Sequence, residues 1–160
     1  MATGTILLPI LAAVADATNP PALSFTTANR PYLEFDDTTD ELCSWHFRMP
    51  VNYASDATIK VIYSMTSATT NVVAVRTELM AIADGEDIDT DNFSTVEASA
   101  DDTVPGTAGL SGEISDVLTT PTIAAGDYVA LRLGRENATS GTNATGDMEV
   151  WAVSLEYTTT

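Results

Sequence analysis

The alternation of apolar and polar residues predicts β-strands along most of this chain. Near its end, Gly126 to Arg135 and Asp147 to Tyr157 both alternate, and a loop rich in Gly, Asn and Thr separates them. Because successive side chains of a strand point to opposite faces, each run has one buried and one solvated face. Two such runs joined by turn-forming residues are typical of antiparallel strands. The chain is therefore predicted to finish inside a sheet.

Six earlier segments share this pattern and are bounded by turn residues. They span residues 31–36, 42–49, 58–65, 72–82, 93–99 and 113–118. Turn signals recur about every 8 to 12 residues, as expected of a β-sandwich, and no long segment has helical spacing. The long connection at residues 101–111 favours Greek-key crossovers. We therefore predict an all-β fold, an eight-stranded jelly-roll β-sandwich, with an immunoglobulin-like sandwich as the alternative.

The N-terminal segment is an apolar run, Ile6 to Ala15, which Pro9 interrupts. It lacks the positive region of a signal peptide, because no Lys or Arg precedes Arg30, and it is too short to span a bilayer. Two interpretations remain open: a short strand on its own domain, or an arm that docks on a neighbouring subunit. We favour the arm, with residues 1–29 as arm and linker and residues 30–160 as the sandwich domain. The predicted subunit or capsid contacts are Ile6, Leu7, Leu8, Pro9, Ile10 and Leu11.

Charge restricts the partners of this single 160-residue domain. Six basic residues face 23 acidic ones, which gives a net charge of -17. Phosphate groups are bound by clusters of Lys and Arg, so nucleic acid is not an expected partner, and neither is an anionic membrane. Cys43 is the only cysteine, so no intrachain disulfide can form. We expect it to be a buried structural thiol.

No catalytic constellation is evident, and we do not expect an enzyme. His46 is the only histidine and points away from Cys43, and the nucleophile motif Gly-x-Ser-x-Gly is absent. Trp45 and Trp151 are in phase with apolar neighbours on their strands, so both are expected in the core. If either side chain were exposed, it could stack on a sugar. Arg132 and Arg135 are candidates for pairing with acidic residues, either within the domain or across an interface.

One acidic loop is a candidate calcium site. Asp87, Asp89 and Asp91 have the alternating spacing with which calcium loops present carboxylates. The loop is not an EF-hand, because Asn92 stands in place of the required Gly and Ala98 in place of the bidentate Glu. A looser calcium site between loops or subunits stays open, and no other cofactor is predicted.

Several structural motifs resemble one known family. These are the segments 30–37, 45–50, 102–109, 124–129 and 144–147. Together they resemble the jelly-roll capsid decoration (cement) proteins of tailed bacteriophages. The resemblance implies a homotrimer that is made in the host cytoplasm, binds the major capsid protein on the outer surface of the head and stabilises the virion. The alternative is a tail or fibre component, or a carbohydrate-binding module, that recognises a host glycan.

Overall fold

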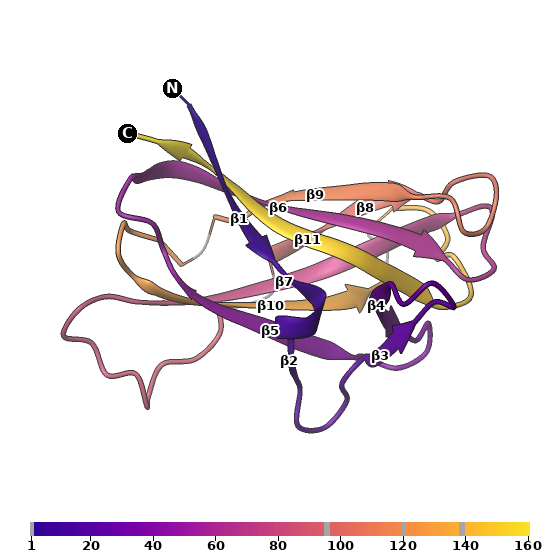
Figure 1. Cartoon of the computed structure of the whole chain (residues 1–160), viewed down its shortest axis with the longest axis horizontal. Helices are drawn as coiled ribbons and strands as arrows, with labels where there is room; N and C mark the ends of the chain where they lie inside the picture. Colours follow the sequence, from indigo (N-terminus) through magenta and orange to yellow (C-terminus); the bar gives the residue numbers. More distant parts are fainter. Residues whose placement is uncertain (1, 95–96, 120, 138–139) are drawn as a thin grey trace.

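The computed structural model describes residues 2–94, 97–119, 121–137 and 140–160, which form a sandwich of two antiparallel sheets (Figure 1). The elements are β1 (Thr3–Leu8), η1 (Ile10–Ala12), β2 (Val14–Ala15), β3 (Ala22–Phe25), β4 (Pro31–Phe35), β5 (Leu42–Arg48), β6 (Tyr53–Met65), β7 (Val72–Ile82), β8 (Glu97–Thr103), β9 (Gly112–Val117), β10 (Tyr128–Glu136) and β11 (Met148–Thr159).

The strand order is that of a jelly roll, which confirms the predicted fold. Sheet A has the order β3-β4-β11-β6-β9, with β1 also paired to β11, and sheet B has the order β2-β5-β10-β7-β8. Strands β4 to β11 correspond to the eight predicted strands. β6 begins at Tyr53, five residues before the predicted start at residue 58. β8 begins at Glu97 where the prediction began at residue 93; residues 95–96 lie outside the described residues.

The N-terminal segment differs from the predicted arm. β1 pairs with β11 from Thr3 to Leu8, and β3 pairs with β4, so both belong to sheet A. The side chains of Leu8 and Ile10 are 3% and 7% exposed and lie in the core of their own chain. Their burial removes apolar surface from water within one domain. The boundary at residue 29 therefore does not separate an arm from a domain in this structure.

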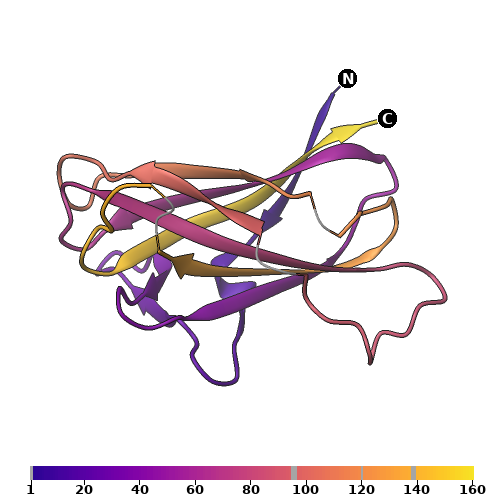
Figure 2. The ribbon, with the colours of Figure 1, turned by 180° about the vertical axis from the view of Figure 1, so that it is seen from behind.

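The core fills the space between the sheets. It contains Phe35, Trp45, Tyr63, Leu131 and Leu155, each at most 2% exposed. Cys43 is 2% exposed, as predicted, and burial raises the pKa of its thiol to about 12. Within the described residues, no helix is long and apolar enough to cross a bilayer. Seen from behind, the loop after β7 projects from one end of the sandwich (Figure 2).

Candidate functional site

Trp151 lies on the outer face of sheet A, so its predicted core position is wrong. The register between β11 and β6 shifts between Val150 and Ala152, which marks a β-bulge. Val150 and Val153 are both buried although they are three residues apart, so the strand changes phase between them. A bulge of this kind turns a side chain to the other face. Trp45 has no such bulge beside it and is buried as predicted.

Trp151 packs against Tyr32 of β4, which also points outward. The two ring centroids are 4.6 Å apart and the ring planes are inclined by 35°. The Trp151 Nε1–H donates to Ser64 Oγ at 2.8 Å, and the Ser64 hydroxyl donates to Glu149 Oε2 at 2.5 Å. Both aromatic side chains are half-buried. The indole is therefore held in one orientation with part of the aromatic pair open to solvent.

A groove opens beside this aromatic pair because two strands share one edge of β11. β4 pairs with Met148 to Val150, and β1 pairs with Val153 to Thr158, so neither strand pairs with Trp151 and a gap separates them along this edge. The chain leaves β1 at Pro9, whose carbonyl accepts a hydrogen bond of 2.9 Å from the buried Trp45 Nε1–H. The groove is lined by Pro9, Ile10, Leu11, Arg30, Pro31 and Trp151.

One polar side chain, Arg30, lines this groove, and two carboxylates lie on the same face of sheet A as the aromatic pair. The β3–β4 turn places Arg30 there: Asn29 has a left-handed backbone (φ 57°), and the Thr26 N–H donates to the Arg30 carbonyl at 3.0 Å. The Arg30 side chain makes no ion pair with any residue that the structure describes. Glu34 lies opposite Glu149 in the ladder and accepts from the Ser24 hydroxyl at 3.2 Å. An apolar platform with hydrogen-bonding groups at its border is typical of a small-molecule site.

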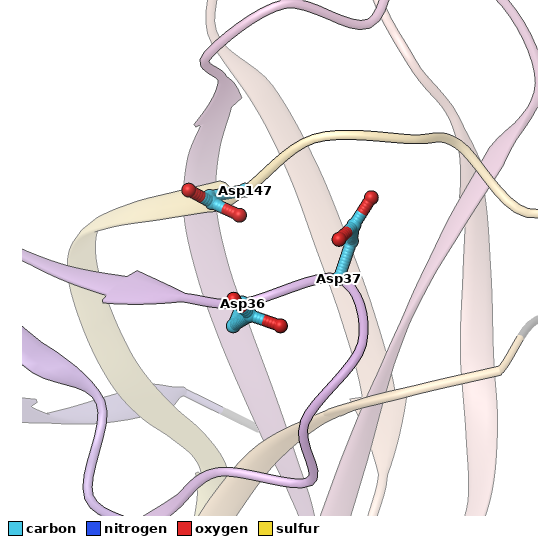
Figure 3. Close-up of side chains that lie close together, drawn as sticks. All are labelled: Asp36, Asp37 and Asp147. Carbon is cyan, nitrogen blue, oxygen red and sulfur yellow. The ribbon is translucent and has the colours of Figure 1, made fainter.

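A second cluster joins Asp36, Asp37 and Asp147, whose carboxylate oxygens lie within 4.8 Å of one another (Figure 3). Phe35 of β4 pairs with Met148 of β11, so the residues just beyond this pair meet at the sheet end. Two hydrogen bonds from Thr38 lower the pKa of Asp36, and the bond from the Thr38 hydroxyl has a larger effect than the bond from its backbone N–H. Oxygen ligands of this kind suit calcium.

Arg135 provides a positive charge close to this aspartate cluster. Its side chain is 8% exposed, and it donates to the carbonyls of Gly146 at 2.7 Å and Ala144 at 2.6 Å. Burial lowers the pKa of Arg135, while the charges of Asp37, Asp147 and Asp36 oppose that change. The guanidinium thus offsets part of the negative charge that a cation would otherwise bind.

The calcium candidates of the sequence lie elsewhere. Asp87, Asp89 and Asp91 are exposed on the loop that follows β7, at the end opposite the aspartate cluster (Figures 1 and 2). Asp87 Oδ1 accepts from the Asp89 backbone N–H at 3.0 Å. Among the described residues, only the Asp36–Asp37–Asp147 group brings three such ligands together. Calcium binding by the loop stays a prediction.

His46 and Arg132 lie on the outer face of sheet B. His46 is exposed, with Nε2 at 3.0 Å from Ser44 Oγ and Nδ1 at 2.6 Å from the Tyr128 hydroxyl. Arg132 Nη1 donates to Glu78 Oε2 at 2.9 Å, which confirms its predicted acidic partner. Arg135, in contrast, bonds directly to carbonyls.

Sequence reasoning missed Tyr32, Glu149 and the aspartate cluster as site residues. The aspartates lie together because β4 pairs with β11, which is distant in the chain, and no local sequence motif predicts that pairing. The position of Trp151 did leave a signal, because buried Val150 and Val153 break the strict alternation of β11.

Comparison with known proteins relates the fold to carbohydrate-binding modules. No protein-family model and no curated protein sequence matches this chain. A family 35 module from Clostridium thermocellum superposes with a TM-score of 0.51 and 11% identity, covering 95% of this chain and 97% of that one. The C-terminal family 6 module of a marine laminarinase from Zobellia galactanivorans superposes with a TM-score of 0.51 and 11% identity, covering 95% of this chain and 98% of that one. A family 35 module from Cellvibrio japonicus superposes with a TM-score of 0.53 and 8% identity, covering 95% of this chain and 92% of that one. The chain is similar to these modules in fold.

Proposed function

We propose that this protein is a non-catalytic carbohydrate-binding module whose site is the Tyr32–Trp151 pair and the adjoining groove. The observation that carries the proposal is the half-buried aromatic pair on the outer face of sheet A, with ring centroids 4.6 Å apart. The C–H face of a sugar ring is apolar and packs on aromatic surfaces, whereas its hydroxyls require hydrogen-bond partners. This site offers both kinds of group.

The polar groups match the needs of sugar hydroxyls. Glu149 and Glu34 lie side by side on the outer face of sheet A and can accept hydrogen bonds. Arg30 can donate from the border of the groove. The hydrogen bond to Ser64 fixes the Trp151 indole before any ligand arrives. A preformed site loses less conformational entropy on binding, which favours affinity.

The fold supports this function, because carbohydrate-binding modules share it. The similar solved structures include carbohydrate-binding modules of families 6 and 35. Because one fold serves many functions, the proposal depends on the aromatic pair. A setting in a phage tail or fibre that recognises a host glycan would use the same chemistry.

A glycan array followed by titration of the best hits tests the proposal. We expect Trp151→Ala to weaken binding about 10- to 150-fold, since losing the burial of one large apolar surface costs about 1.5–3 kcal/mol. Tyr32→Ala should weaken it too. Tyr128→Ala is the matched control, because Tyr128 lies half-buried on the outer face of the other sheet. No glycan bound, or binding unchanged in Trp151→Ala, would refute the proposal.

Tryptophan fluorescence gives an independent readout. Trp45 is 2% exposed, whereas Trp151 is half-buried at the site. A bound sugar should therefore shield one of the two tryptophans from acrylamide quenching. The same titration of Trp151→Ala should show no change in quenching, since only Trp45 remains.

Capsid decoration is a second candidate, favoured by the exposure of Leu7 and Leu11, which are 75% and 65% exposed near the N-terminus. In this role the protein would sit as a homotrimer on the virion surface, against the major capsid protein. The double variant Leu7→Ser/Leu11→Ser should then lose binding to undecorated phage heads while its unfolding midpoint changes little. Retained binding would count against the role.

A further inference from the structure

Two glutamates face each other beside the aromatic pair on the outer face of sheet A. Glu34 of β4 and Glu149 of β11 are directly opposed in the ladder, two residues along their strands from Tyr32 and Trp151. Directly opposed side chains have Cβ atoms about 4.5–5.5 Å apart, and like charges at that spacing destabilise a sheet. The strand rise places this carboxylate pair about 7 Å from the aromatic pair. One sugar-sized ligand can therefore contact both pairs.

No cation of the described chain neutralises this carboxylate pair. Neither Glu34 nor Glu149 makes an ion pair with any residue that the structure describes. Each accepts one hydroxyl hydrogen bond at Oε2, from Ser24 at 3.2 Å and from Ser64 at 2.5 Å respectively. Their Oε1 atoms accept none from the described residues, although both oxygens of an ionised carboxylate are acceptors. The pair thus keeps its mutual repulsion and has acceptor atoms left for a ligand.

The basic side chains nearest to this pair lie at the other end of the site or have other partners. Arg30 borders the groove and is four residues from Glu34, about 13 Å at the rise of a strand. Lys60 pairs with Glu113, and Arg135 donates to two backbone carbonyls. The aspartate cluster follows the glutamates at the same end of the sheet. The site is therefore negative beside the aromatic pair and positive only at its groove end.

A protonated amine fits both features of this arrangement. A cation is attracted to the face of Trp or Tyr, and carboxylates accept charge-assisted hydrogen bonds from it. We propose that the glycan recognised here carries a free amine, as a de-N-acetylated hexosamine does, with the amine between Glu34 and Glu149 and the ring on the aromatic pair. This inference rests on the proposed function, since it assigns the substrate class of the same site. The net charge of -17 also favours the approach of a cationic glycan.

Calorimetric titration with a glucosamine oligosaccharide, and with the same oligosaccharide fully N-acetylated, tests this assignment. N-acetylation removes the charge and keeps the ring, so the glucosamine form should bind about tenfold more tightly. The double variant Glu34→Gln/Glu149→Gln should lose this preference, because Gln keeps an acceptor for each serine hydroxyl and removes both charges. Glu34→Gln alone replaces it if the double variant unfolds, and should reduce the preference.

Asp89→Asn/Asp91→Asn is the matched control. It removes two charges from an exposed loop, so it should keep the preference if the glutamates act by position and lose it if only net charge matters. Loss of the preference in this control would overturn the assignment. Salt gives a second readout, because screening should weaken binding of the glucosamine form and hardly change binding of the N-acetylated form.

The amine assignment and the proposed function fail in different ways. Equal affinity for both oligosaccharides, or a preference that survives the Gln variants, would overturn the assignment alone, provided that Trp151→Ala still weakens binding. A lysine peptide that competes as well as the glucosamine form would also overturn it, since the site would then select a cation and not a sugar. If neither oligosaccharide binds, the assignment is wrong, and the glycan array decides the proposed function.

Discussion

Replacing the buried Arg135 with Met should destabilise the protein more than replacing a basic residue at an exposed site. Arg135 lies at the end of β10 with 8% of its surface exposed and bonds to two carbonyls of the loop before β11. Met preserves much of the apolar stem and removes the charge and the donors. The Ala144 carbonyl belongs to a buried residue and would lose its bond to Arg135.

The cost follows from the contacts that are lost. A buried polar group left without its partner costs about 1–3 kcal/mol. Asp36, Asp37 and Asp147 would also lose the guanidinium that offsets their mutual repulsion, a smaller effect because solvent screens these partly exposed carboxylates. We therefore expect the free energy of unfolding to fall by about 1–3 kcal/mol. In a domain of this length, the midpoint falls by roughly 5 °C.

Thermal and urea unfolding followed by circular dichroism measure this change. Lys60→Met is the control, because the Lys60–Glu113 pair is 3.3 Å apart with side chains 27% and 51% exposed. Exposed pairs contribute about 0–1 kcal/mol, so this control should unfold nearly as the original protein does. Added salt should recover part of the loss in Arg135→Met by screening the aspartates. If the two variants differ by less than about 1 kcal/mol, the reasoning about the buried guanidinium is refuted.

Two further predictions concern tight packing and a buried thiol. A Cβ added at Gly112 would lie 2.5 Å from the Tyr63 ring. Gly112→Ala should therefore lower the free energy of unfolding, measured with urea, by about 1–3 kcal/mol. An unchanged midpoint would contradict the close contact. Cys43 should resist thiol reagents at pH 8 unless the protein is unfolded, since its pKa is raised to about 12. As pH rises above about 9, the thiol ionises in the unfolded chain before it ionises in the folded protein, which favours unfolding. The free energy of unfolding should therefore fall between about pH 9 and pH 12, and Cys43→Ala should not show this fall.

The regular alternation predicted strands well wherever one face is buried and the other solvated. It failed in the first eight residues, where Leu7 is exposed between the more buried Ile6 and Leu8. An apolar residue on the solvated face hides the alternation, so β1 resembled a continuous apolar arm. The pairing of β1 with β11 also joins the two ends of the chain, and no local pattern contains that information.

The candidate site was predicted less well, and the reason is the bulge in β11. A strict period of two extends the phase of Val153 and Leu155 back to Trp151 and places the indole in the core. The bulge reverses that phase between Val150 and Ala152. It falls where β4 stops pairing with β11 and before β1 starts. The side chain turned outward there packs against Tyr32 of β4 on one side and borders the groove on the other. The phase change and the gap between these two strands thus act together: the first exposes an aromatic side chain, and the second provides the groove beside it. Departures from regular alternation in a sandwich therefore indicate where a binding surface can form.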